Sequence, residues 1–335
     1  MYRPAIAIVT ATTRMQGLLM RWGTKGAARF RLNQALLHQS KSLTTKSTLT
    51  IGETATTEHE QSNDATFAEY EREDLAYQDS IDKIRREVDL GYPVTIVQRQ
   101  HIPNFDFSSV VVVIVVGQDG LVANVAKYAR GLPIIGINPD PSRIDGILVP
   151  FQSNQVRVVL QRVLKDSASV RDVTLARASM NDGQTMLAFN DFFIGRRSHA
   201  SARYTLQVGD ESESQSSSGV IVATGAGSTG WLSSVFNMAR GVSQWIGGQT
   251  EQAPALHWDD RRLIWIVREP FQSKHSSIQH IAGAIDETES LSLSSLMPDT
   301  GVVFSDGIES DFMEFNSGST LRVHVAKEVA RLVVP

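Results

Sequence analysis

The sequence predicts a Rossmann-like α/β domain with a parallel sheet, followed by a mainly β domain that forms a sandwich. Residues 110–116 are seven consecutive β-branched residues, bounded by turn residues. Such a run indicates a strand buried on both faces, because a half-exposed strand alternates apolar and polar side chains. After residue 170 the pattern changes to short apolar stretches separated by turn-rich segments, which is typical of a sandwich. We expect the two domains to cover residues 1–165 and 166–335.

Strand and helix patterns alternate in the first domain, which predicts parallel strands joined by crossovers. Strands are expected over 5–9, 93–97, 110–116 and 133–137, and helices over 14–37, 67–88, 121–130 and 156–164. Gly17, Gly23 and Gly26 weaken the first helix. Residues 39–65 are rich in Ser, Thr and Gln, and that composition predicts a surface loop or a disordered insertion.

Composition limits the function classes. The 335 residues carry a net charge of -4 and no cysteine, which excludes disulfides, thiolate metal sites and a cysteine nucleophile. No basic stripe with interleaved aromatics supports nucleic-acid binding, and no apolar run is long enough to span a membrane. The eight histidines show no metal-ligand spacing. We therefore expect a cytoplasmic protein.

The chain is organised around the turn Gly117-Gln118-Asp119-Gly120, which lies between the apolar strand and a helix. Glycines let backbone N–H groups approach an anion closely, and the helix N-terminus adds a positive dipole. Ligands of open α/β sheets bind at such strand ends. The alternative is that the segment is a tight turn in which Asp119 caps the helix.

Three other polar turns follow apolar strands. Asn138 and Asp140 lie in a turn at the same sheet edge, and they are either turn residues or a second wall of one cleft. Asn190 and Asp191 interrupt the apolar stretch 186–194, which a bulge or a bound ligand explains. In the segment 224–230, Ser228 either caps the next helix or helps to form an anion site, and these two interpretations are compatible.

Together, the stretches 117–120, 189–195, 218–231 and 305–307 resemble, in order and spacing, the motifs of the NAD kinase family. Thr12-Thr13-Arg14, Gly136–Arg143, Ser198–Tyr204 and Arg268-Glu269-Pro270 are similar to mitochondrial-type NAD kinases and their bacterial relatives. The resemblance implies a nucleotide cleft between the two domains, ATP and Mg²⁺ as phosphate donor and cofactor, NAD as acceptor, and a homo-oligomer such as a dimer.

The resemblance also implies residue roles. Asp119 would contact the adenosine 2′-hydroxyl of NAD and remove its proton, while Gly117 and Gly120 leave room for phosphate. Asn190 and Asp191 would hold the dinucleotide, and the other side of the cleft would be lined by Thr224, Gly225, Ser228 and Thr229.

The sequence departs from the family at Gln118, where a glycine is usual, and at Leu121, where a threonine is usual. Both changes fall on the phosphoryl-transfer side of the site. The leading hypothesis is an ATP-dependent NAD kinase. The alternatives are a kinase of the same fold for a sugar or lipid hydroxyl, and a non-catalytic protein that binds NAD or another nucleotide.

Overall fold

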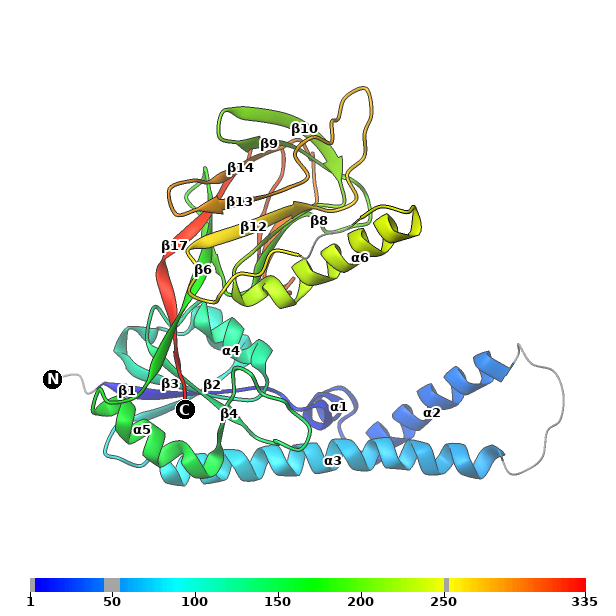
Figure 1. Ribbon diagram of the computed structural model, residues 1–335. Helices are drawn as coiled ribbons and strands as arrows, with labels where there is room; N and C mark the ends of the chain where they lie inside the picture. Colours follow the sequence, from blue (N-terminus) through cyan, green and yellow to red (C-terminus); the bar gives the residue numbers. More distant parts are fainter. Residues whose placement is uncertain (1–3, 45–54, 250–252) are drawn as a thin grey trace.

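The computed structural model describes residues 4–44, 55–249 and 253–335. It contains an N-terminal α/β domain and a C-terminal β domain stacked above it (Figure 1). The predicted parallel sheet is confirmed, with the order β2-β1-β3-β4. Its strands are β1 (Ala5–Thr10), β2 (Val94–Gln98), β3 (Val110–Val116) and β4 (Pro133–Asn138), with the short β5 (Phe151–Gln152) beside β4.

Helices cover both faces of this sheet. On one face, α3 (Ala55–Glu87) and α5 (Val156–Leu164) bury Ile81, Ile84 and Leu160 against β1 and β3. On the other face lies α4 (Asp119–Ala126), whose Val122 and Val125 pack on Val9 and Val113. The burial of β3 on both sides explains its unbroken valine run.

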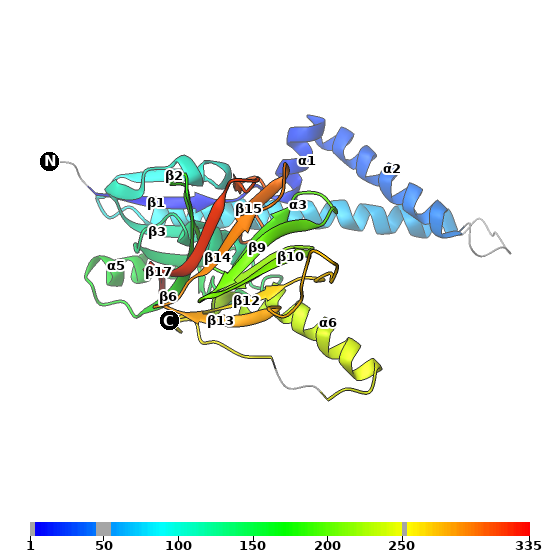
Figure 2. The ribbon, with the colours of Figure 1, turned by 90° about the horizontal axis from the view of Figure 1, so that it is seen from above.

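The first predicted helix is divided into α1 (Arg14–Trp22) and α2 (Lys25–Thr44) at Gly23, whose φ of 78° ends α1. The predicted loop over 39–65 is wrong where the structure describes it, because α2 continues to residue 44 and α3 begins at residue 55. Residues 45–54 lie outside the described part of the chain. Polar composition did not distinguish a loop from a helix that extends beyond the sheet (Figures 1 and 2).

The C-terminal domain is the predicted sandwich. One layer pairs β6 (Val170–Met180), β7 (Thr185–Ala188), β9 (Ala202–Val208), β10 (Glu211–Ser217), β14 (Leu291–Ser295) and β17 (Thr320–Val333). The other has β8 (Asp191–Arg196), β11 (Val220–Ala223), β12 (Arg262–Val267), β13 (Ala282–Asp286), β15 (Gly301–Ser305) and β16 (Phe312–Glu314). Tyr204 and Trp265 are among the side chains that fill the core between the layers.

Strand β17 joins the domains. Its first half pairs with β14 and β6, and Arg331 and Leu332 near its end pair in parallel with Pro133 and Ile134 of β4. One sheet therefore continues from the sandwich into the α/β domain. Above α4, the helix α6 (Trp231–Trp245) projects from the second domain (Figure 1). Among the described residues, no helix is long and apolar enough to cross a membrane.

Candidate functional site

A cavity of about 550 Å³ lies at the carboxyl ends of β1 and β3, where the N-termini of α1 and α4 meet. It is lined by Thr12 and Thr13 before α1, and by Gly117, Gln118 and Gly120 around the start of α4. Thr13 caps α1, because its hydroxyl accepts the N–H of Gln16. Two helix dipoles therefore direct their positive ends toward this cavity, which favours an anion.

Arginines add positive charge to this anion pocket. Arg14, Arg99 and Arg143 line it together with Glu73. Arg14 and Arg143 both pair with Glu73 and Glu69 of α3, and the hydrogen bonds to these glutamates raise the pKa of Arg14 against the effect of burial. Arg99 is exposed and makes no ion pair with a described residue. A bound phosphate group would meet the guanidinium of Arg99, which has no ion pair among the described residues. It would also meet those of Arg14 and Arg143, which the glutamates of α3 hold in position.

Asp119 is the first residue of α4, and the predicted capping role is wrong because Gln118 occupies the N-cap position. The half-buried carboxylate of Asp119 accepts hydrogen bonds from the backbone N–H of Leu148 at 2.9 Å and of Ile147 at 3.2 Å. Its chain neighbours Gln118 and Gly120 line the anion pocket, whereas Asp119 is not part of that lining. A carboxylate has about four acceptor positions, so Asp119 keeps capacity for a further donor.

The two positions that depart from the family have different surroundings. Gln118 is exposed at the anion pocket and makes no capping hydrogen bond. Leu121 also borders the pocket, but it is only 4% exposed and belongs to the apolar core beneath α4. The leucine therefore acts mainly in packing.

Asn138 and Asp140 organise the loop that follows β4. The Asn138 amide donates to the carbonyl of Ile144 at 2.8 Å and accepts the N–H of Asp140 at 3.0 Å. Asp140 accepts from the N–H and the hydroxyl of Ser142, and it lines the anion pocket. Both residues serve the turn, and Asp140 also presents a carboxylate to the cavity.

Asn190 and Asp191 lie at the break between β7 and β8. Asp306, which follows β15, anchors this break: its carboxylate accepts the N–H of Asn190 at 2.6 Å and of Phe189 at 3.3 Å, while its own N–H donates to the carbonyl of Asp191. The Asn190 side chain makes no hydrogen bond to any described residue and is partly exposed. Asp306 thus fixes the main chain of this break, and the side-chain amide of Asn190 stays available to a ligand.

Asp191 is a buried residue, 7% exposed as a whole, and its carboxylate accepts no hydrogen bond within the described ranges. Burial raises its pKa to about 7, and the charge of Asp306 adds to that rise. Buried polar groups are usually hydrogen-bonded, and strongly shifted carboxyl groups concentrate at functional sites. Asp191 therefore has the surroundings of a ligand-binding carboxylate.

The turn after β11 packs against this break. Thr224 is completely buried, and its hydroxyl donates to the carbonyl of Phe189 at 2.5 Å, so it positions the break. Gly225 and Gly227 let this turn lie directly against neighbouring backbone. A Cβ at Gly227 would lie 2.1 Å from the Asn190 carbonyl oxygen. Ser228 bonds back to the carbonyl of Gly225, whereas Thr229 is exposed. The predicted Ser228 cap is wrong, because Gly230 takes the N-cap position of α6.

Sequence reasoning did not assign a role to Lys127, just after α4, or to Asp306. The ammonium of Lys127 donates to the Ser305 hydroxyl at 2.8 Å and pairs with Asp306 at 3.5 Å. Burial raises the pKa of Asp306, and Lys127 opposes that rise. The Asp306-Gly307 pair was visible in the sequence as a motif, but Lys127 carried no signal because its partner is far along the chain.

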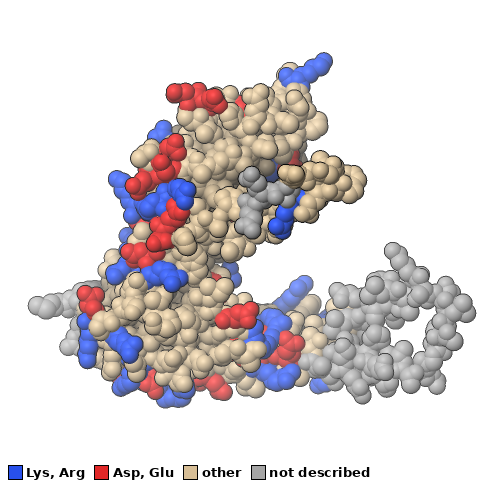
Figure 3. Space-filling model, in the orientation of Figure 1, with Lys and Arg blue, Asp and Glu red and all other residues tan. Residues whose placement is uncertain are grey.

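The helix α4 lines the anion pocket at its N-terminus and packs in the apolar core that also holds Phe189, next to Asn190. Leu121 and Val122 of this helix share one apolar core with Phe189 and Ala226. Figure 3 shows a deep opening between the two domains on the side where α6 projects above α1 and α3. The structure thus brings Gly117, Gln118, Gly120 and Asp140 together at one cavity. It gathers Asn190, Asp191, Thr224 and Gly225 into a second group.

No protein-family model matches the chain, and no curated protein sequence matches it. Among solved structures, an NAD kinase from Archaeoglobus fulgidus in complex with ATP is similar, with a TM-score of 0.53. The match covers 76% of this chain and 89% of that one, at 18% sequence identity. This likeness establishes the architecture, an α/β domain joined to a β-sandwich. The chain has the two-domain fold of an NAD kinase.

Proposed function

We propose that the protein is an NAD kinase, which transfers the γ-phosphate of ATP to the adenosine 2′-hydroxyl of NAD and yields NADP. The observation that carries the proposal is the buried carboxylate of Asp191, beside Asn190, without a hydrogen-bond donor among the described residues. Ribose hydroxyls and an adenine amino group are donors that would satisfy it. The shared fold and the four ordered motifs support the same conclusion.

The anion pocket would hold the phosphates of ATP. Phosphoryl transfer requires the protein mainly to position the acceptor and to neutralise phosphate charge. The two helix N-termini and the guanidinium of Arg99 suit that task. The carboxylate of Asp140 would hold Mg²⁺ together with the phosphates, since this ion commonly takes one or two carboxylates and substrate oxygens. Bound there, Mg²⁺ would neutralise charge on the transferred group.

Asp119 would act as the base. The N–H groups of Ile147 and Leu148 fix its carboxylate in one orientation. A fixed carboxylate that still has acceptor capacity can take the proton of a hydroxyl within hydrogen-bond reach. Gly120, the next residue, lines the anion pocket and has no side chain, so it would leave room for a phosphate group near Asp119.

The test is NADP formation by the purified protein with NAD, ATP and Mg²⁺, in parallel with polyphosphate as donor and with sugars as acceptors. Asp119→Asn should lower kcat by about 10²–10⁴-fold, which is the usual contribution of a general base, and retain NAD binding. Asp286→Asn is the control, since Asp286 also accepts a backbone N–H, from Thr288, but lies on β13. Unchanged turnover in Asp119→Asn would refute its role as base.

NAD binding without NADP formation would support the non-catalytic alternative, with Gln118 restricting the phosphate site. Phosphorylation of a sugar alone would support the alternative of another kinase of this fold. We also propose, from the sequence motifs, a relationship to mitochondrial-type NAD kinases and a homo-oligomeric state. Light scattering after size-exclusion chromatography tests the latter, and a stable monomer would refute it.

A further inference from the structure

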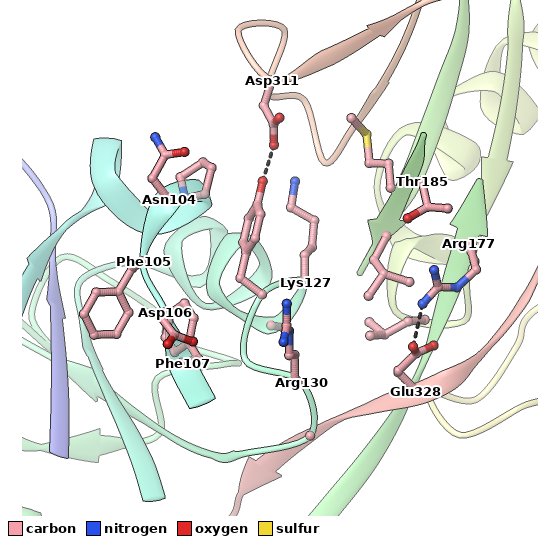
Figure 4. Close-up of a pocket in the computed structure, with 17 residues that line it drawn as sticks. Asn104, Phe105, Asp106, Phe107, Lys127, Arg130, Arg177, Thr185, Asp311 and Glu328 are labelled. Atoms are coloured by element: carbon pink, nitrogen blue, oxygen red, sulfur yellow. Dashed lines mark hydrogen bonds and ion pairs between the residues drawn. The ribbon is translucent and has the colours of Figure 1, made fainter. Parts of the chain in front are cut away.

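A second cavity, of about 760 Å³, lies between the domains at the opposite end of α4 from the anion pocket. Its lining includes Lys127, Tyr128 and Arg130, which follow α4, and the segment 103–107, which precedes β3. Strands β6 and β7 form the facing wall (Figure 4). None of the residues that the sequence motifs identified lines this cavity. The cavity is therefore distinct from the anion pocket, and Lys127 on its lining links it to Asp306 beside the Asn190–Asp191 break.

The acidic groups that line the cavity already have partners. Asp106 accepts the N–H and the hydroxyl of Ser108, Asp311 accepts the hydroxyl of Tyr128, and Glu328 accepts the guanidinium of Arg177 at 2.5 Å. Figure 4 shows the last two of these contacts on either side of the cavity. Each of the three carboxylates therefore has at least one donor, although Oε2 of Glu328 is buried without a hydrogen-bond partner among the described residues.

The three cationic side chains of the lining differ in whether they have hydrogen-bond or ion-pair partners. Lys127 is bonded to Ser305 and Asp306, and Arg177 to Glu328. Arg130 has no hydrogen bond or ion pair with any residue that the structure describes, although its charge helps to keep the pKa of Asp106 low, after the hydrogen bonds from Ser108. In Figure 4 its guanidinium lies between the two walls of the cavity. Among the three cationic side chains of the lining, exposed Arg130 is thus the one available to an anionic ligand.

The backbone at Arg130 is strained. Its φ is +49°, in the left-handed region, and Gly131 follows with φ +78°. Residues with a Cβ seldom adopt this conformation, and glycine adopts it without cost. Strain of this kind collects at functional positions. A large charged side chain at a position that suits glycine indicates that its guanidinium has a use.

Besides the polar side chains of Asn104 and Thr185, apolar side chains supply much of the remaining lining. Phe105 and Phe107 pack edge to face with centroids 4.8 Å apart, and Leu175, Met186 and Leu187 face them from the β strands. Small-molecule sites typically have such a volume, mostly apolar walls and a few polar groups that orient the ligand. The lining suits a flat apolar or aromatic body with one anionic group.

We propose that this cavity binds a small organic anion with an aromatic or apolar body, held through its anionic group by Arg130. The ligand would be an aromatic carboxylate or a nucleoside monophosphate, which share this chemistry. This goes beyond the proposed function, since the site is separate from the NAD and ATP sites.

Calorimetric titration with nicotinate and with AMP tests the proposal. The AMP titrations use protein carrying Asp191→Asn together with Arg99→Gln, which weakens binding at the proposed adenosine site and at the anion pocket, and the comparison with and without Arg130 assigns the remaining binding to the second cavity. Arg130→Gly removes the guanidinium and relieves the backbone strain, so the variant should be at least as stable as the parent protein. Asp166→Gly is the matched control, because exposed Asp166 also has a positive φ, +54°, but follows α5.

At least one probe should bind saturably, with an unchanged Kd in Asp166→Gly and a Kd raised about tenfold or more by Arg130→Gly, the usual effect of losing one charge-assisted contact. Thr185→Trp, at an exposed lining position of β7, should also weaken binding by filling the cavity. The probe that binds identifies the ligand class. Absence of saturable binding for both probes, or equal Kd values with and without Arg130, would overturn the proposal. A failed NADP assay would leave these binding results unaffected.

Discussion

Lys127 and Asp306 form an ion pair of 3.5 Å across the domain boundary, with side chains 3% and 2% exposed. The same Asp306 carboxylate holds the main chain of Asn190. Lys127→Met should therefore lower the free energy of unfolding by about 3–5 kcal/mol, because it leaves a buried carboxylate without its counter-charge. Urea denaturation measures this change.

A double variant provides the control for this pair. Lys127→Met with Asp306→Asn removes both charges, and it should lose less stability than Lys127→Met alone. NAD binding should weaken in both variants, since Asp306 positions Asn190. A loss below about 1 kcal/mol in Lys127→Met would show that the pair contributes no more than a surface contact.

Asp191 should make stability depend on pH. Its pKa is about 7 in the folded protein, against 3.8 for a free aspartate carboxyl group, so the folded state binds the extra proton between these values. Stability of the ligand-free protein should fall as pH rises from about 4 to 7. At pH 8, Asp191→Asn should be more stable than the unmodified protein by about 3–5 kcal/mol, from the size of the shift.

Urea denaturation at pH 5 and pH 8 without ligand tests this dependence. Asp182→Asn is the control, because Asp182 is exposed and hydrogen bonds from Gln184 lower its pKa, so it does not titrate in this range. The free energy of unfolding of Asp182→Asn should change with pH as much as that of the unmodified protein. If the free energy of unfolding of Asp191→Asn also changed by that same amount, the raised pKa of Asp191 would be contradicted.

Gly227→Ala should disrupt the Asn190–Asp191 break. The new Cβ would lie 2.1 Å from the carbonyl oxygen of Asn190, so the backbone must shift, at a cost of about 1–3 kcal/mol. NAD binding should be lost in calorimetry. Gly241→Ala is the control: it lies in α6 with nothing near its Cβ, and it should gain up to about 1 kcal/mol from helix propensity. Normal NAD affinity in Gly227→Ala would separate this turn from the dinucleotide site.

Arg99→Gln should raise the KM for ATP by about tenfold, the scale of one charge-assisted contact, and leave stability unchanged because Arg99 has no ion pair among the described residues. Arg240→Gln, on exposed α6, is the matched control. Initial-rate kinetics with each substrate varied in turn provide the measurement. A raised KM for NAD with an unchanged KM for ATP would place the nicotinamide dinucleotide, and not the donor, in the anion pocket.

Much of the fold could be predicted from local patterns. The valine run of β3, the amphipathic stripe of α3 and the short strands after residue 170 each reflect burial of the element on one or two faces. The loop expected over 39–65 was wrong where described, because polar composition does not exclude a helix. The pairing of the final strand β17 with both domains depends on contacts that local patterns do not indicate.

The sequence by itself determined the order of the elements and the polar turns at Gly117–Gly120, Asn190–Asp191 and Gly225–Thr229, because turn chemistry and periodicity are local properties. Only the tertiary structure decided that Asp119 binds the backbone of Ile147 and Leu148, and that Lys127 pairs with Asp306. It also decided the burial of Asp191, which sets its pKa. These features depend on contacts between residues far apart in the chain, and on desolvation, which one sequence does not display.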